Sequence, residues 1–569
     1  MVASRRSRFT QLVRASVAAV GWFTLTLSYS CTSAPSNTGM PTLASGGAEV
    51  AASGSNGASA GEDAIFGSGA AGGSGAAGGA GAAGGAGSVA NGAGGMTAAG
   101  ARGCAVSAND TWTPLPSTGE PSVREEPWVI PIDDGMLVFG GYYHDGTVND
   151  PFLDDGAIYH LCSETWLPTS KAQVPHAITD TVAHRPVGTW TGTDLLVWGG
   201  FPATVQFNGY LEGAKVAFAA RYGAKNDTWS AMNRSGEPTA RDDEARVWTG
   251  SKLLVWGGVA QSGDSSWVNH ADGALYDPVS DRWTRMSGLG APAGRSTTGH
   301  VAWTGNQLIV WGGLSYSTGS GFSPTYTSLN DGAIYDVASD RWTPMATAGA
   351  PSPGAAPPIW TGKKLIVISQ LDGYTTPGKV DFEGALFDPA TNAWTPMRAP
   401  DSALADTLES AEQRLYWTGS VLALFGVKVR QGTGGPVMLL YAPDTDQWSA
   451  AQMPSAPSYY QWQSVSVASG KLVVLGPGPQ TRDARGADHE STAIAVFDPQ
   501  TRSWTSPPLL ANRSRPGFVA LPGQLLVWGG TDIYTDLNAP NPCLGASGPC
   551  DPVTPTKRVL LSDGATLRF

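Results

Sequence analysis

One pattern recurs along residues 104 to 569 and constrains the fold more than any other feature of this sequence. In its fullest form the pattern is a stretch ending in Trp-Thr-Gly, an apolar run ending in Trp-Gly-Gly, a polar loop, Asp-Gly-Ala, an aromatic strand and a closing Trp. The clearest copy starts at Ala302 and ends at Trp342. A repeated unit of this kind cannot bury its apolar face alone, so neighbouring copies must stack against one another.

The glycine-ended strands and the closing tryptophans are equal in number but offset along the chain. The eight strands end at Gly140-Gly141, Gly199-Gly200, Gly257-Gly258, Gly312-Gly313, a degenerate Ile368-Ser369, Gly426, Gly476 and Gly529-Gly530. The eight tryptophans are Trp112, Trp166, Trp229, Trp283, Trp342, Trp394, Trp448 and Trp504. Trp112 therefore precedes every glycine pair, and the last unit lacks a tryptophan. A propeller removes its seam when a strand from one terminus completes the sheet begun at the other.

The sequence therefore predicts an all-β propeller of eight four-stranded blades, closed by an N-terminal strand. The aliphatic runs suit strands that are buried on both faces. The tryptophans, at one equivalent position per unit, are expected to wedge between blades.

The glycine pair, the turn Tyr276-Asp277-Pro278 and the spaced tryptophan resemble the kelch repeat, as in bacterial kelch-containing proteins and the central domain of galactose oxidase. The resemblance implies a kelch-like β-propeller over residues 103–569. It implies little about function, because propellers host both enzymes and binding modules.

Residues 1–31 have the pattern of an export signal, with arginines followed by a mostly apolar run and Cys31. The segment from Leu27 to Cys31 resembles a bacterial lipobox, in which the cysteine is acylated, although Leu27 lies one position too far away. Cleavage and release without lipidation is the alternative. Residues 32–102 consist largely of Gly, Ala and Ser and are predicted to be a flexible tether. We therefore expect an exported protein, lipid-anchored at the cell envelope (outer membrane or cell surface) or secreted.

Four further cysteines fit two disulfides in an oxidising compartment. Cys543 and Cys550 bracket a turn-rich segment and are the first predicted pair, and Cys104 with Cys162 follows by elimination. No metal site is expected, because no histidine lies near these cysteines and neither pair has the spacing of common zinc knuckles.

The charge balance limits the partners. Lys plus Arg number 35 and Asp plus Glu 47, which gives a formal net charge of −12. Nucleic acid and anionic membrane surfaces are therefore not expected partners of the folded part, and the membrane is expected to be contacted only through the lipid anchor.

Candidate ligand-binding residues lie on long loops, where function usually resides. In kelch-like blades the loops between the second and third strands and those between blades resemble a shared ligand-binding face. An arginine recurs just before the first strand of a unit, at Arg124, Arg185, Arg241, Arg295 and Arg513, and His300 follows Arg295 at the kelch spacing. Convergence of these side chains would form a cationic ring suited to carboxylates or acidic sugars. The alternative is that each arginine bonds backbone carbonyls of its neighbouring blade.

Aromatic residues outside the repeat, among them Trp267 and Tyr316, are candidates for a carbohydrate- or peptide-binding platform. The alternative is that they pack the loops onto the propeller.

Three functions are compatible with these features. The leading hypothesis is a module that binds a glycan, peptide or protein through its long-loop face, with no cofactor. The alternative is a carbohydrate-active enzyme at the channel mouth, of the mutarotase or lyase type or, least favoured, a copper oxidase. The third is a structural surface protein. No common catalytic motif occurs, so no catalytic residue is assigned and the enzyme question stays open, leaning to no.

Overall fold

The structure is a computed structural model in which part of the chain is described. The described residues are 111–124, 127–141, 153–171, 187–199, 218–261, 266–297, 299–317, 325–354, 356–376, 379–401, 404, 414–425, 437–454, 464–514, 516–535 and 556–568. The predicted signal, the lipidation site Cys31, the tether, Cys104, Arg185, Cys543 and Cys550 lie outside them.

Within these residues, eight four-stranded antiparallel sheets share one strand order and are called blades 1 to 8. Blade 1 has β2 (Trp128–Ile132), β3 (Gly135–Phe139), β4 (Gly156–His160) and β5 (Thr165–Pro168). Blade 2 has β6 (Val187–Trp190), β7 (Asp194–Gly199), β8 (Phe218–Gly223) and β9 (Thr228–Ala231). Blade 3 has β10 (Ala245–Trp248), β11 (Leu253–Trp256), β14 (Gly273–Asp277) and β15 (Arg282–Arg285). Blade 4 has β16 (Val301–Trp303), β17 (Gln307–Trp311), β20 (Gly332–Asp336) and β21 (Arg341–Pro344).

The second half of the chain repeats this order. Blade 5 has β22 (Ile359–Trp360), β23 (Leu365–Thr376), β24 (Lys379–Asp388) and β25 (Ala393–Pro396). Blade 6 has β26 (Arg414–Trp417), β27 (Leu422–Phe425), β28 (Val437–Ala442) and β29 (Gln447–Gln452). Blade 7 has β30 (Ser464–Ala468), β31 (Lys471–Pro477), β34 (Thr492–Asp498) and β35 (Ser503–Thr505). Blade 8 has β36 (Gly517–Leu521), β37 (Gln524–Trp528), β40 (Gly564–Arg568) and, outermost, β1 (Thr113–Pro114).

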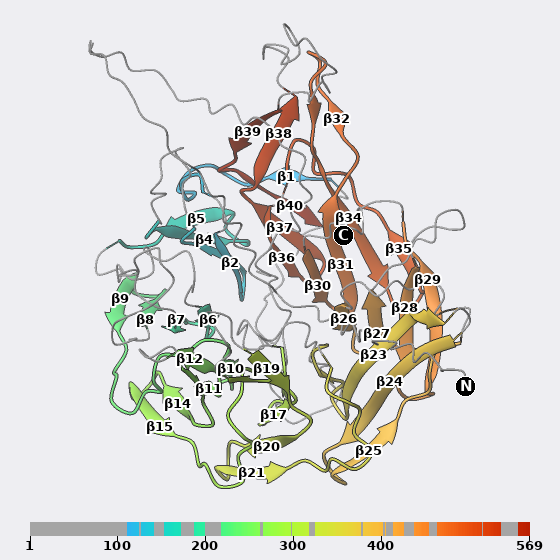
Figure 1. The fold of residues 1–569 in the computed structure, drawn as a ribbon. Helices are drawn as coiled ribbons and strands as arrows, with labels where there is room; N and C mark the ends of the chain where they lie inside the picture. Colours follow the sequence, from blue (N-terminus) through green and yellow to red (C-terminus); the bar gives the residue numbers. More distant parts are fainter. Residues whose placement is uncertain are drawn as a thin grey trace, which may run out of the picture.

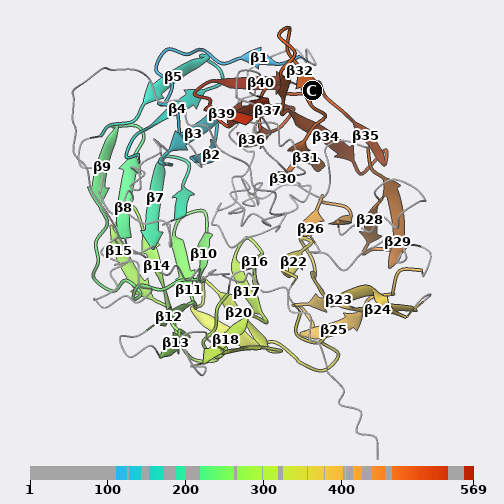
Figure 2. The ribbon, with the colours of Figure 1, turned by 45° about the horizontal axis from the view of Figure 1, so that its top comes forward.

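The blades form a ring with their first strands innermost (Figures 1 and 2). First strands of several neighbouring blades contact one another, among them β2 with β6, β22 with β26 and β30 with β36, and β36 of blade 8 contacts β2 of blade 1. The predicted all-β, kelch-like propeller is confirmed. Because parts of the chain lie outside the described residues, the total number of blades stays a prediction.

The predicted closure by an N-terminal strand is also confirmed. Strand β1 pairs with β40, with Thr113 opposite Thr566 and Pro114 opposite Ala565. Blade 8 is thus built from both ends of the folded region (Figure 2). This pairing covers an edge that would otherwise expose unpaired backbone groups.

The core lies between blades, because the second strand of each blade is buried on both faces, as in the fully buried β11 and β27. The closing tryptophans wedge between blades as expected. The Trp283 ring lies 5.7 Å from that of Trp198 in the preceding blade, and Trp342 lies 5.1 Å from Trp256 in the same way. Aromatic pairs at these separations add to the energy of apolar burial.

A turn aspartate ties each of several blades to the preceding one. In blade 3, Asp281 Oδ1 accepts hydrogen bonds from the Tyr276 hydroxyl at 2.7 Å and from the backbone N–H of Asn233, which follows blade 2, at 2.9 Å. Equivalent pairs of bonds involve Asp227, Asp340 and Asp446.

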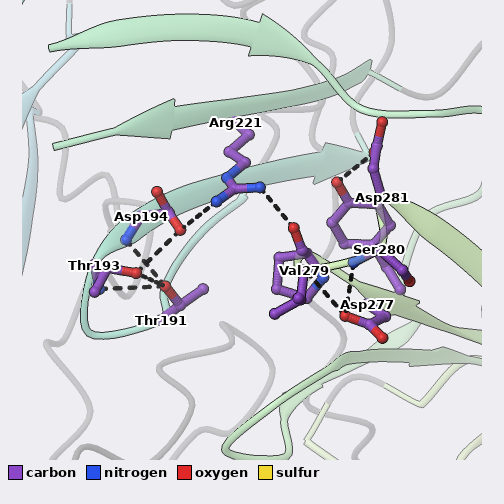
Figure 3. Close-up of polar contacts among 10 residues, drawn as sticks. Thr191, Thr193, Asp194, Arg221, Asp277, Val279, Ser280 and Asp281 are labelled. Carbon is purple, nitrogen blue, oxygen red and sulfur yellow. Dashed lines mark hydrogen bonds and ion pairs between the residues drawn. The ribbon is translucent and has the colours of Figure 1, made fainter. Parts of the chain in front are cut away.

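Arg221 adds a further link between blades 2 and 3 (Figure 3). Its guanidinium donates to Asp194 Oδ2 at 2.9 Å within blade 2 and to the carbonyl of Pro278 in blade 3 at 2.6 Å. We found no candidate membrane-spanning helix in the described part of the chain.

Candidate functional site

Two β-hairpins stand on one end of blades 3 and 4, in the connections between their second and third strands. The first pairs β12 (Val259–Gln261) with β13 (Trp267–Asn269), and the second pairs β18 (Leu314–Ser317) with β19 (Thr325–Ser328). We call these four strands the hairpin surface. The sequence predicted long loops here, and the structure shows ordered strands within them.

The Asn269 side chain joins the two hairpins. Its Nδ2 donates to the carbonyl of Tyr316 at 2.7 Å, and its Oδ1 accepts from the N–H of Tyr316 at 2.8 Å. A primary amide that bonds both backbone groups of one residue imitates a neighbouring strand. The two hairpins are therefore held in one fixed arrangement.

Three aromatic rings follow one another across this surface. The centroid of Tyr316 lies 5.0 Å from that of Trp267 and 6.2 Å from that of Tyr326. Tyr326 is 39% exposed and Val268 is 42% exposed, and every residue of β19 is exposed. The two predicted aromatic residues, Trp267 and Tyr316, are thus brought together, and the row continues to solvent through Tyr326.

Asp243 lies at the base of the hairpin surface. Its Oδ2 accepts a hydrogen bond from the Ser296 hydroxyl at 3.1 Å, and its carbonyl accepts from the Thr297 N–H at 2.7 Å. Ser296 in turn forms an antiparallel bridge with Leu314 of β18. Burial raises the pKa of Tyr316, and the Asp243 carboxylate and Tyr326 raise it further. The Asp243 carboxylate therefore lies close enough to act electrostatically on Tyr316, the central residue of the row.

The recurring arginines hold the Asp-Gly turn at the start of each third strand. Arg241 Nη1 donates to the carbonyls of Gly257 at 3.1 Å and Asp272 at 3.2 Å, and it lies 2.9 Å from the Asp272 carboxylate. Equivalent contacts to a glycine carbonyl and an aspartate pair Arg124 with Asp155, Arg295 with Asp331 and Arg513 with Asp563.

These contacts bury the guanidinium groups of the four described arginines. The side chains of Arg241 and Arg295 are 0% exposed, whereas those of their partners Asp272 and Asp331 are 66% and 48% exposed. In both pairs, therefore, the aspartate carboxylate is exposed to solvent and the guanidinium is not. Arg124, Arg241, Arg295 and Arg513 bond backbone carbonyls, which is the alternative that the sequence left open, and a ligand role for these side chains stays a prediction.

His300 lies next to Arg295 at the start of blade 4. Burial, together with the Arg295 guanidinium, lowers the pKa of His300 to about 4, so the imidazole is neutral at pH 7. Its backbone is held by bonds to Thr297 and Trp311. An arginine, an acid and a histidine thus gather in blade 4 as a mutarotase or lyase would need, but Arg295 is buried and already paired. The enzyme alternative stays a prediction.

Sequence reasoning missed two polar groups. Asn269 and Ser296 tie the hairpin surface together, and only the short pattern Trp267-Val268-Asn269 could have indicated a strand there.

A further sheet joins β32 (Thr481–Arg482), β33 (Asp488–His489), β38 (Thr531–Thr535) and β39 (Thr556–Leu560).

That sheet contains a second missed contact. His489 Nδ1 lies 2.8 Å from Asp532 Oδ1, and its ring stacks on Tyr534 at 5.0 Å. The sequence offered no signal for it, because the histidine and the aspartate are 43 residues apart.

The described residues include only some of those on which the metal and disulfide predictions depend. No group of three or more His, Cys, Asp or Glu side chains that could hold a metal ion occurs among the described residues. Cys162 is disulfide-bonded. Its predicted pairing with Cys104, and the pair Cys543–Cys550, involve residues outside the described part and stay predictions.

Comparison with known proteins finds kelch-repeat relatives. The KLHDC2/KLHL20/DRC7 Kelch-repeats domain family matches residues 187–426. An F-box/kelch-repeat protein of Arabidopsis thaliana is 30% identical over 159 residues, which cover 26% of this chain and 30% of the relative. Kelch-like protein 15 of Mus musculus is 23% identical over 320 residues, which cover 53% of this chain and 48% of the relative. The chain thus matches about a third to a half of the length of these relatives.

Among solved structures, that of YjhT matches with 13% sequence identity and a TM-score of 0.29, over 58% of this chain and 100% of the other. The alignment spans the whole of that chain.

Proposed function

Because the folded part of this chain is a kelch-repeat β-propeller, we propose that it binds a protein or peptide partner on the hairpin surface. Kelch propellers serve as binding or scaffold domains, and this supports a polypeptide partner over the other ligands that the sequence allowed.

One observation carries the proposal: the aromatic row Trp267, Tyr316 and Tyr326 is fixed in place but left accessible. The blade cores are complete without it, since the cluster that joins blades 3 and 4 is built from strand residues such as Trp256 and Trp342. The two hydrogen bonds between the Asn269 side chain and the Tyr316 backbone hold the row in place. Ordered, half-exposed aromatic side chains provide contact area at low entropic cost, which is typical of binding hot spots.

We further propose that this binding takes place outside the cytoplasm, with the propeller carried on a tether. The support is the sequence alone: an arginine-containing start, an apolar run, Cys31 and then a Gly/Ala/Ser-rich stretch. Labelling with radioactive palmitate, compared between the full chain and Cys31→Ser, tests the anchor. Equal labelling of both would contradict it.

Site-specific photo-crosslinking tests the binding proposal on the full chain in its native envelope. A benzophenone amino acid replaces Tyr326 in one variant. In the control it replaces Val279, which is 94% exposed and lies at the other end of blade 3, next to the β14–β15 turn. We expect a discrete polypeptide adduct from position 326 and none from 279. Adducts at both positions, or at neither, would contradict binding at the hairpin surface, and attachment of glycan without polypeptide would favour the carbohydrate alternative.

A further inference from the structure

The charge around the hairpin surface has one sign. Asp272 lies three residues after β13 and Asp331 three residues after β19, so both carboxylates flank the hairpins. Their guanidinium partners, Arg241 and Arg295, are fully buried. Hydrogen bonds to backbone carbonyls on two sides hold each guanidinium in place, so it cannot turn outward without losing them.

The hairpin strands themselves carry no charge. Their sequences are VAQ, WVN, LSYS and TYTS. The third flanking carboxylate, Asp243, lies at the base of the row, and its charge helps to raise the pKa of the Tyr316 hydroxyl. His270, at 3.5 Å, and then Arg241 hold the pKa of Asp272 well below its usual range. The described charges that reach solvent around the row are therefore carboxylates.

From this arrangement we infer that the partner segment on the hairpin surface is basic, and that one of its lysine or arginine side chains packs against the aromatic row with its charge toward Asp243. The inference rests on the proposed function and adds the chemistry of the partner. A cation gains from the faces of the aromatic rings and from the carboxylates together. An acidic segment would meet like charge from Asp243, Asp272 and Asp331.

Each aromatic ring and each carboxylate should contribute only modestly to the binding of the cation. A cation over an exposed aromatic face gains about 0.5–1 kcal/mol, so loss of one ring or one carboxylate should weaken binding about 2- to 5-fold. Because the carboxylates are partly exposed, the attraction should also weaken as salt rises.

The test uses the full chain and three synthetic peptides of the same length. The first is a Thr/Gly peptide carrying three arginines, and in the others glutamate or citrulline replaces each arginine. Calorimetry at low and at high salt measures the dissociation constants. We expect the arginine peptide to bind at least about tenfold more tightly than the citrulline peptide at low salt, and the glutamate peptide not to bind.

Two variants each remove one group that is expected to contact the basic side chain of the partner. Asp243→Asn removes a charge without changing shape, and asparagine tolerates the left-handed backbone at φ 58°. Tyr326→Ser removes an exposed ring. The matched controls are Asp277→Asn and Val279→Ser at the opposite end of blade 3, where the Asp277 side chain caps the Val279 N–H. Each hairpin variant should weaken arginine-peptide binding about 2- to 5-fold, and the controls should leave it unchanged.

The outcomes separate the two proposals. If the citrulline or glutamate peptide binds as well as the arginine peptide, and Tyr326→Ser weakens that binding, the surface binds polypeptide but the basic chemistry is wrong. If no peptide binds, or if the controls weaken binding as much as the hairpin variants, the inference fails. Only the crosslinking result at position 326 then decides the proposed function.

Discussion

Trp112 donates its indole N–H to the carbonyl oxygen of Pro508 at 2.9 Å, which joins two residues 396 positions apart. Trp448 makes the same bond inside the ring, to the carbonyl of Arg398 at 2.7 Å. The residue that closes blade 8 from the N-terminal side therefore repeats the contact of an internal blade.

Removing this contact should open the seam. We expect Trp112→Phe to lower the free energy of unfolding by about 1 kcal/mol, since it loses one hydrogen bond. Trp112→Ala also loses packing and should cost about 2–3 kcal/mol, because the side chain is only half-buried. Urea unfolding measures both, with Trp448→Ala as the matched internal variant. If the Ala and Phe variants at 112 were equally stable, the ring would contribute no packing.

Asp281 should be replaceable by asparagine but not by alanine. Its Oδ1 accepts from the Tyr276 hydroxyl and the Asn233 N–H, and its φ is 52°. Burial and the bond to Asp281 raise the pKa of Tyr276, so the hydroxyl stays a donor.

Blade 5 already has asparagine at the equivalent turn, where Asn392 accepts from the Ala346 N–H at 2.9 Å. Asp281→Asn should therefore change the free energy of unfolding by less than about 1 kcal/mol, and Asp281→Ala should lower it by about 2–4 kcal/mol. Thermal unfolding measures the difference. A destabilised asparagine variant would mean that the charge, rather than the acceptor, matters.

Ala293→Ser should stabilise the protein. In blades 1 and 3 the residue two positions before the arginine is Ser122 or Thr239, and its hydroxyl accepts from Nη2 at 2.9 Å. In blade 4 that residue is Ala293, and Nη2 of Arg295 is buried with no hydrogen-bond partner among the described residues.

A serine hydroxyl at position 293 should raise the free energy of unfolding by about 0.5–1.5 kcal/mol. Ala511→Ser is the comparison variant and should gain less, because Nη2 of Arg513 already has a partner in Asp563 at 2.5 Å, whereas Nη2 of Arg295 has none among the described residues. Urea midpoints measure both, and an equal gain at 511 would show that the hydroxyl acts in some other way.

His300 should make the fold sensitive to acid. Its pKa is lowered from 6.5 to about 4, so below pH 6.5 the unfolded chain takes up a proton that the folded protein refuses. Stability from this group is therefore complete above pH 6.5 and is lost as the pH falls toward 4, by up to about 3 kcal/mol. His300→Gln should reduce the loss of stability between pH 7 and pH 4.5, measured by urea unfolding. Parallel pH profiles for both proteins would contradict a buried neutral imidazole.

Much of the fold was predictable, because each repeated residue serves its own blade or the next one. The glycine pairs, the aliphatic runs and the spaced tryptophans have local reasons that recur in every unit. The offset of Trp112 alone predicted the closure that β1 and β40 form. Of the candidate site, Trp267 and Tyr316 were predicted and do lie together.

The repeats alone predicted the propeller, its repeated core and the seam, because strands that recur with apolar faces need neighbouring blades to bury those faces. The site depends on contacts that only the folded chain makes. Whether a recurring arginine faces solvent depends on carbonyls and carboxylates that lie 16 to 36 positions away, as for Arg241 and Arg295. Asn269 and Tyr316 are 47 positions apart. The sign of the charge on this face follows from which member of each ion pair is buried, and only the folded chain sets that.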